Sequence, residues 1–178
     1  MKKLVLPIIV LSLFVSGLGN DLSIVVGGAP TSDLEINKET FTDIELKSFT
    51  VFGVRFEKGL VSILGWENNF LFSTNVMTPK GLSGENGLSM TTNLVLNIPA
   101  SETVVPNFAV GFGFLHRFGE SFPNIGSSFV TSWGGGLKFR EVIGPAGFRF
   151  DYRRMRIYSV EDSSVIANEL TGGIMFSF

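Results

Sequence analysis

Most side chains that could do chemistry in this chain are charged residues set among small ones. Charges removed from water must be paired, because the desolvation of a lone charge is strongly unfavourable. The favoured interpretation is an ion-pair network inside the fold, and the alternative is a narrow, cation-lined path with a weak preference for anions. The candidates lie on the polar side of stretches with alternating polar and apolar residues: Arg55, Glu67, Lys138, Arg140, Arg149, Asp151 and Arg153.

Catalytic residues are scarce. The chain has one His, His116, and no Cys, which excludes a thiol nucleophile, disulfides and thiolate metal sites. Acyl transfer needs a base close to its nucleophile, and Ser121 is near in sequence. His116 nevertheless falls on the aromatic side of its stretch, which is typical of a residue at a membrane interface. We expect no catalytic residues, no enzyme activity and no cofactor.

Ligands for ions are also few. Glu35, Glu39 and Asp43 do not have the spacing of a calcium loop, so no metal site is expected. The net charge of −2 argues against nucleic-acid binding. Arg154 and Arg156 differ, because guanidinium groups pair well with phosphate. They are candidates for contact with lipopolysaccharide.

Residues 1–19 have the order of a secretory signal peptide. Lys2 and Lys3 precede an apolar run from Leu4 to Val15, and small residues follow. The run is too short to span a membrane as a helix. A retained anchor is the alternative. The expected organisation is a signal peptide over 1–19 and one domain over 20–178.

The dominant period after residue 20 is two residues. Between Asn107 and Phe118, aromatic and aliphatic residues alternate with Ala, Gly and Arg. Side chains alternate across a strand, so this period predicts strands with one apolar face. Eight segments show it, at 21–28, 45–57, 60–74, 88–98, 104–118, 128–141, 146–158 and 167–178. We expect short turns at Lys58–Gly59, Pro99–Thr103 and Val142–Pro145, and longer loops at 29–44, 75–87, 119–127 and 159–166.

Eight alternating segments of about ten residues predict an all-β fold, an eight-stranded antiparallel up-and-down transmembrane β-barrel. Small and charged residues suit a narrow lumen, whereas Phe, Trp and Leu suit lipid. Hydrophobic residues make up 44% of the chain and charged residues only 17%. The inverted arrangement, a soluble barrel with aromatic residues inside, is the alternative, since the period alone does not decide which face is inward.

The C-terminus resembles the assembly signal of outer-membrane barrels. That signal ends in an aromatic residue and has polar, glycine and hydrophobic positions before it, which Thr171, Gly173, Phe176 and Phe178 match. In those proteins the barrel-assembly machinery reads this strand. The resemblance implies that the machinery is a partner of this chain during biogenesis.

Residues 45–178 resemble the OmpA/OmpX-type small barrel domains. The resemblance rests on Gly134–Phe139 followed by Gly147–Arg153, and on Pro106–Gly113, where Asn107 replaces the usual aromatic residue. It implies a monomeric, plugged barrel in the bacterial outer membrane, in contact with its lipid and lipopolysaccharide. We expect a structural or surface-interaction role. A narrow channel and a lipid-modifying enzyme are the alternatives.

Overall fold

The computed structural model describes residues 20–36, 39–41, 48–74, 86–118, 127–158 and 163–178. Its strands are β1 (Asn20–Ile36), β2 (Glu39–Phe41), β3 (Phe49–Val61), β4 (Leu64–Thr74), β5 (Asn86–Asn97), β6 (Val104–Phe118), β7 (Ser127–Ile143), β8 (Ala146–Tyr158) and β9 (Ser163–Ser177). Within these residues, no helix is long and apolar enough to cross a membrane. Residues 1–19, where the signal peptide is expected, lie outside the described part.

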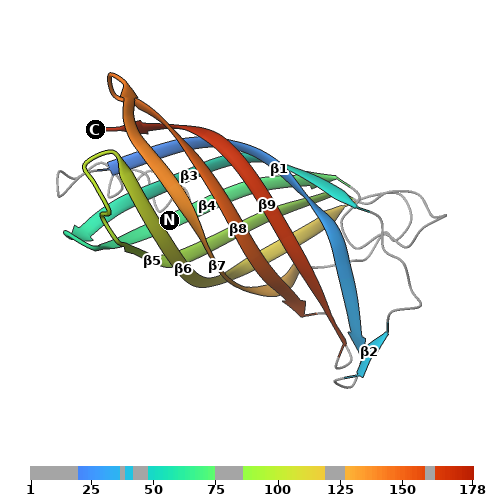
Figure 1. The fold of residues 1–178 in the computed structure, drawn as a ribbon. Helices are drawn as coiled ribbons and strands as arrows, with labels where there is room; N and C mark the ends of the chain where they lie inside the picture. The colour runs from blue at the N-terminus through green and yellow to red at the C-terminus, as the bar shows by residue number, and fades with distance from the viewer. Residues whose placement is uncertain (1–19, 37–38, 42–47, 75–85, 119–126, 159–162) are drawn as a thin grey trace, which may run out of the picture.

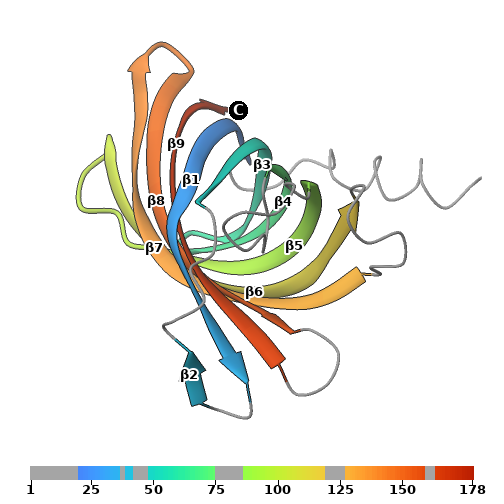
Figure 2. The same cartoon turned by 90° about the vertical axis from the view of Figure 1, so that its right-hand side faces the viewer.

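The strands close into a barrel. Antiparallel pairs join β1, β3 and each later strand in sequence order, and β1 also pairs with β9 (Figures 1 and 2). β2 lies outside this ring and pairs only with the far end of β1. The predicted eight-stranded antiparallel up-and-down barrel is therefore confirmed. We call the end with the described termini the turn end and the opposite end the loop end.

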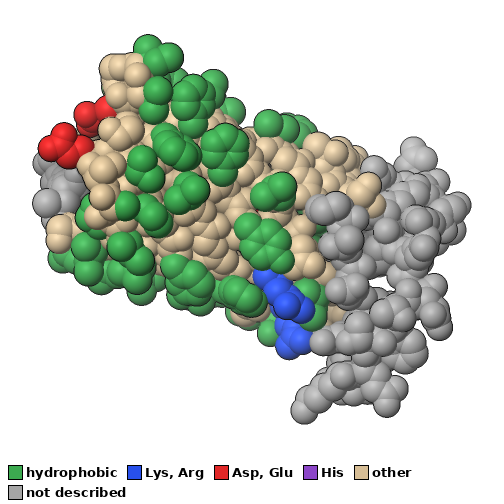
Figure 3. Space-filling view, viewed as in Figure 1, with side chains coloured by type: hydrophobic (Ala, Val, Ile, Leu, Met, Phe, Trp, Pro, Cys, Tyr) green, Lys and Arg blue, Asp and Glu red, His purple; other side chains and the backbone are tan. Residues whose placement is uncertain are grey.

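Apolar side chains cover the outside of the barrel, as Figure 3 shows for one face. The exposed fractions of Phe112, Phe150 and Trp133 are 53%, 55% and 50%, whereas Arg55 and Glu67, on the opposite face of their strands, are fully buried. The inverted arrangement with aromatic residues inside is therefore wrong. Such an outer surface is stable only where lipid replaces water around it.

The turn expected at Lys58–Gly59 is wrong. Both residues lie in β3 and pair with Trp66 and Gly65 of β4, and the chain reverses at residues 62–63. The pairing shifts between Gly59 and Val61, so the glycine lies beside an irregularity of the ladder rather than in the turn. Glycine inside a strand often marks such a site.

The first strand is longer than expected. Residues 29–36, assigned to a loop, continue β1, and residues 39–41 form β2. Proline cannot donate to the ladder, which suggested that Ala29–Pro30 ends the strand. Instead the β1–β9 pairing shifts register between Gly28 and Thr31, so the proline is passed at a bulge and the strand resumes.

The other connections agree with the expectations to within a few residues. β7 and β8 meet in a tight turn at Gly144 and Pro145, where Gly144 has a φ of +60°, a conformation that glycine adopts without strain. The connection at 98–103 matches the one expected at Pro99–Thr103. The last strand begins at Ser163 rather than 167. Most residues of the loops expected at 75–87, 119–127 and 159–166 lie outside the described part of the chain.

Candidate functional site

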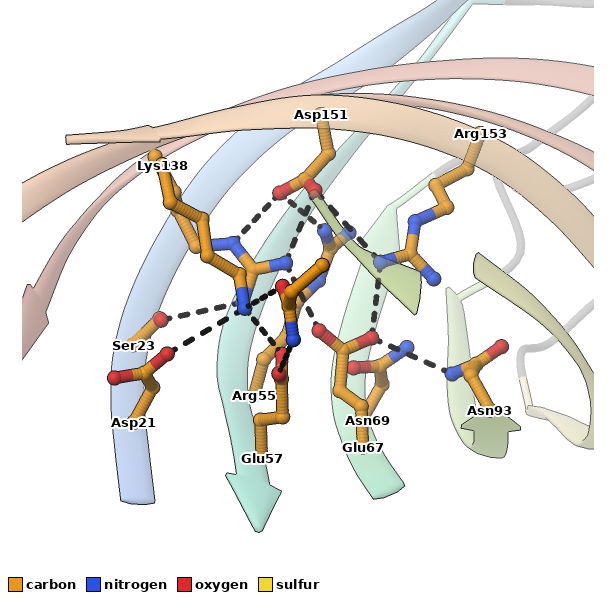
Figure 4. Close-up of polar contacts among 12 residues, drawn as sticks. Asp21, Ser23, Arg55, Glu57, Glu67, Asn69, Asn93, Lys138, Asp151 and Arg153 are labelled. Atoms are coloured by element: carbon orange, nitrogen blue, oxygen red, sulfur yellow. Dashed lines mark hydrogen bonds and ion pairs between the residues drawn. The ribbon is translucent and has the colours of Figure 1, made fainter. Parts of the chain in front are cut away.

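The inward positions of the strands bring ten charged side chains together inside the barrel, and Figure 4 shows part of this set. Each points inward because its strand alternates, and closure of the sheet makes neighbours of strands distant in sequence. Of these ten, the sequence singled out seven, and the structure joins all seven by ion pairs. The cations are Arg55, Lys138, Arg140, Arg149 and Arg153, and the anions are Asp21, Glu57, Glu67, Asp151 and Glu169.

Arg149 lies at the centre of this lumen network. Its Nη2 is 2.9 Å from Oε2 of Glu67, and its Nε is 2.7 Å from Oδ2 of Asp151. Arg55 also donates to Asp151, at 2.8 Å, and to Glu169, at 2.7 Å. Arg153 donates to Glu67 at 2.9 Å. All six side chains are at most 3% exposed, so their charges are stabilised by one another rather than by water.

A second group of charges lies nearer the turn end. Lys138 donates to Glu57 at 2.6 Å and to the side-chain oxygen of Asn97 at 3.0 Å. Arg140 lies beside it and donates to Asp21 at 2.7 Å. The Arg140 side chain is 30% exposed, so it marks the boundary between the lumen network and water. Hydrogen bonds of the network thus join side chains from several strands.

Sequence reasoning missed three members of the network: Asp21, Glu57 and Glu169. Without them the candidate set held five cations and two anions, an imbalance that a closed lumen cannot hold without further anions. That imbalance was a signal in the sequence. Among the ten side chains of this network, cations and anions are equal in number.

Nearer the loop end the lumen holds an apolar cluster, which sequence reasoning also missed, beside the buried side chains of Ser73, Ser89 and Ser128. Buried apolar side chains pack together there in one cluster: Ala29, Phe49, Val51, Leu115, Val130, Met155, Ile157 and Ala167. These apolar side chains point into the lumen, as the charged side chains do. The alternation within a strand therefore does not distinguish an apolar inward position from a charged one. The described lumen is therefore filled in two layers, an ionic one and a mainly apolar one.

The one histidine lies on the outer surface near the loop end. His116 Nδ1 is 3.3 Å from Oγ of Ser127, its cross-strand neighbour on β7, and both residues are exposed. The His116 ring also stacks on Phe118, with ring centroids 6.5 Å apart. The expected outward position of His116 is what the structure has. Ser121 lies outside the described residues. Ser127 was not expected beside His116, because the contact depends on the pairing of β6 with β7.

Arg154 and Arg156 also face outward, in the half of β8 nearer the loop end. They line an open hollow of about 260 Å³ together with Thr131, Trp133, Tyr158 and Ile166. Glu35, Glu39 and Asp43, the acidic residues weighed as calcium ligands, have no described side chains. In the part of the chain whose side chains are described, no three acidic or histidine residues converge as a metal site would require.

The four residues of the assembly signal lie in or just beyond β9, the strand that closes the barrel against β1. Thr171 is buried toward the lumen, whereas the rings of Phe176 and Phe178 face outward, 40% and 61% exposed. Phe178 N donates to the carbonyl of Asn20 at 2.9 Å, and Asn20 N donates back at 2.8 Å. The end of the chain is thus paired at the closing seam.

No family model matches the chain, and no curated protein sequence matches it. Solved structures do. Neisserial surface protein A superposes with a TM-score of 0.66 and 12% identity, over 90% of this chain and 97% of the other. The outer membrane protein OprG from Pseudomonas aeruginosa superposes with a TM-score of 0.62 and 15% identity, over 90% of this chain and 96% of the other. The N-terminal β-barrel domain of OprF from the same organism superposes with a TM-score of 0.52 and 11% identity, over 90% of this chain and 97% of the other. The chain therefore has the fold of the small OmpA/OmpX-type outer-membrane β-barrels.

Proposed function

We propose that this chain is an outer-membrane barrel with a structural or surface-interaction role and a lumen closed to solutes. The observation that carries the proposal is the two-layer filling of the lumen. An ion or a solute would have to separate Arg149 from Glu67 and Asp151, and then pass the apolar cluster beside Leu115 and Ile157. We infer that the two layers together block the passage of ions.

The proposal places the loop end at the cell surface and the turn end in the periplasm. Outer-membrane barrels have short periplasmic turns and longer outer loops, and the described connections at 62–63, 98–103 and 144–145 are all at the turn end. Loops on a rigid scaffold are the usual place for binding residues, so the partner contacts are proposed at the loop end. Outer-membrane lipid and lipopolysaccharide would surround the barrel, and the barrel-assembly machinery would act during its insertion.

Conductance in planar lipid bilayers tests the closed lumen. Purified wild-type protein is expected to insert without current steps. The double variant Arg149→Ala and Leu115→Ala serves as the positive control. It replaces one large side chain with alanine in each of the two layers. Wild-type steps as large as those of the double variant would establish the channel alternative instead.

One observation favours a second candidate function, a lipid-modifying enzyme. The exposed pair of His116 and Ser127 has the residue types that acyl transfer needs, at 3.3 Å, on the surface that lipid would cover. Such chemistry also needs a group that orients the base. Within the described residues, no carboxylate hydrogen bonds to His116, so the pair lacks that support and the enzyme stays second.

Release of fatty acids from phospholipid and lipopolysaccharide vesicles tests this candidate. The proposed structural role predicts none from wild type. Release that is lost in Ser127→Ala and His116→Ala would establish the enzyme. Ser128→Ala is the matched control, because Ser128 lies next to Ser127 on the same strand but is buried toward the lumen.

A further inference from the structure

Two polar side chains lie on the outer surface of the barrel, within its apolar belt. Asn68 of β4 and Thr92 of β5 are cross-strand neighbours. Both residues are half-buried and point outward, since the positions on either side of each are buried toward the lumen. Their outward neighbours along the two strands are exposed apolar residues: Trp66, Phe70, Met90 and Leu94. Both polar groups therefore lie at a depth where the proposed function places lipid hydrocarbon.

Neither group has a side-chain hydrogen bond within the described residues. The Thr92 hydroxyl is covered by its neighbours, so the Asn68 amide is the group that a partner can reach. A bond between the two would still leave most of the amide unsatisfied, because an amide has two donors and two acceptor positions. Asn168 of β9 is also outward, but the Tyr152 hydroxyl donates to it at 2.9 Å. Unpaired polar groups are unfavourable in hydrocarbon, so Asn68 calls for a partner from outside the barrel.

The outer surface around Asn68 carries no full charge. β4, β5 and β6 lie side by side in the wall of the barrel (Figure 2). None of their outward side chains is a Lys, Arg, Asp or Glu. The outer surfaces of β3 and β8 differ, because they hold Lys58 and Arg154. Two identical surfaces can therefore meet at β4–β6 without bringing like charges together, which would be unfavourable.

We propose that the outward side chains of β4, β5 and β6, which we call the β4–β6 face, pair with the same face of a second copy of this chain. The dimer goes beyond the proposed function and differs from the monomer that the family resemblance implies. Copies in one membrane share one orientation, so a two-fold axis along the membrane normal places both Asn68 side chains at the same depth. Each amide carries donors and acceptors, so the two can bond to each other.

The depth of Asn68 favours a protein partner over a lipid. The outward positions toward the turn end are Trp66 and Leu64, and those toward the loop end are Phe70 and Phe72. Four residues of a strand span about 13 Å, which is roughly 10 Å of depth for a tilted strand. A lipid would have to bring its polar ester groups that far into hydrocarbon. Apolar surfaces gain little from association in lipid, so hydrogen bonds between polar side chains give such a dimer its preferred face.

Single cysteines report which faces of two copies meet, because the chain has no cysteine of its own. Leu94→Cys places a thiol on the β4–β6 face, and Ile24→Cys places one on β1, where the side chain is also exposed. Outer membranes containing each full-length variant are oxidised with copper phenanthroline and run on non-reducing gels. A disulfide-linked dimer is expected from Leu94→Cys and not from Ile24→Cys.

Sedimentation equilibrium in a neutrally buoyant detergent gives the dissociation constant of the dimer. Asn68→Leu should raise this constant by about tenfold, because the hydrogen bonds between the two copies are lost. Leucine suits a position that faces lipid, so this variant should fold, and gel mobility without boiling checks that it does. Asn168→Leu is the matched control, since Asn168 is an outward amide with a partner in its own chain, and it should leave the constant unchanged.

Three results would overturn the proposal. A wild-type protein that stays monomeric at every concentration would exclude the dimer. Equal dissociation constants for wild type and Asn68→Leu would remove the amide from the interface. Equal cross-linking from Ile24→Cys would mean that copies collide without a defined face. The conductance of the same preparation reports on the closed lumen independently, so the dimer and the proposed function can fail separately.

Discussion

The substitution Arg149→Met probes the lumen network at its centre. Arg149 is fully buried and pairs with Glu67 at 2.9 Å and with Asp151 at 2.7 Å. Its loss leaves one more anion than cation among the paired groups, in a space closed to water. The removal of one partner of a buried pair typically costs about 3–5 kcal/mol. We expect the free energy of unfolding to fall by about that amount, since methionine restores packing but not charge.

The assay is reversible urea unfolding in phosphatidylcholine vesicles, followed by tryptophan fluorescence. Arg149→Met with Glu67→Gln restores the charge balance, so the double variant should lose less stability than the two single variants together. Coupling between residues in contact is about 0.5–3 kcal/mol. Lys58→Met removes an outward cation near the turn end, and we expect a small effect as the control.

A loss below about 1 kcal/mol for Arg149→Met would match the low value of solvent-exposed pairs and would refute a buried network. Strictly additive single effects would also refute it, because they would mean that Arg149 and Glu67 do not interact. Either result would place water in the lumen and would favour the channel alternative.

Three further predictions concern the wall of the barrel. Phe178→Ala should lower the amount of folded protein in outer membranes while leaving refolding in detergent nearly unchanged, which quantitative gels of both samples would measure. Gly134→Val should block closure, because a Cβ there overlaps the carbonyl oxygen of Tyr152 on β8, and refolding yield would report it. Phe112→Arg should reduce stability in vesicles by about 2–4 kcal/mol, and Phe118→Arg, nearer the loop end, by about 0–1 kcal/mol. A reversed order for the two arginine variants would contradict the depth assigned to them.

The fold could be predicted from the sequence because its signal is periodic. Alternation identifies the two faces of each strand, as at Asn107 to Phe118, and the number of segments gives the number of strands that close the barrel. Strand ends were harder to predict. Lys58–Gly59 has turn residues but pairs within the ladder, and Pro30 interrupts a strand without ending it. The pairing with neighbouring strands determines the structure at both positions. A pattern within one segment of the sequence carries no information about that pairing.

The candidate site could be predicted only in part for a related reason. Alternation places Arg55, Glu67 and Asp151 on one face, but not at one height in the barrel. Glu169 escaped notice because its neighbours in sequence are not charged, although it lies 2.7 Å from Arg55 in space. The meeting of His116 with Ser127 likewise depends on the register of β6 against β7. The register between two strands depends on the pairing of the whole sheet, so it cannot be predicted from one segment.

The mobility of the protein in SDS gels, with and without boiling, tests the membrane-spanning barrel most directly. Outer-membrane fractions containing the full chain would be compared with the soluble fractions of the same cells. We expect the protein to be recovered with the outer membrane and its unboiled band to run faster than its boiled band. Recovery as a soluble protein whose mobility does not change on boiling would contradict it.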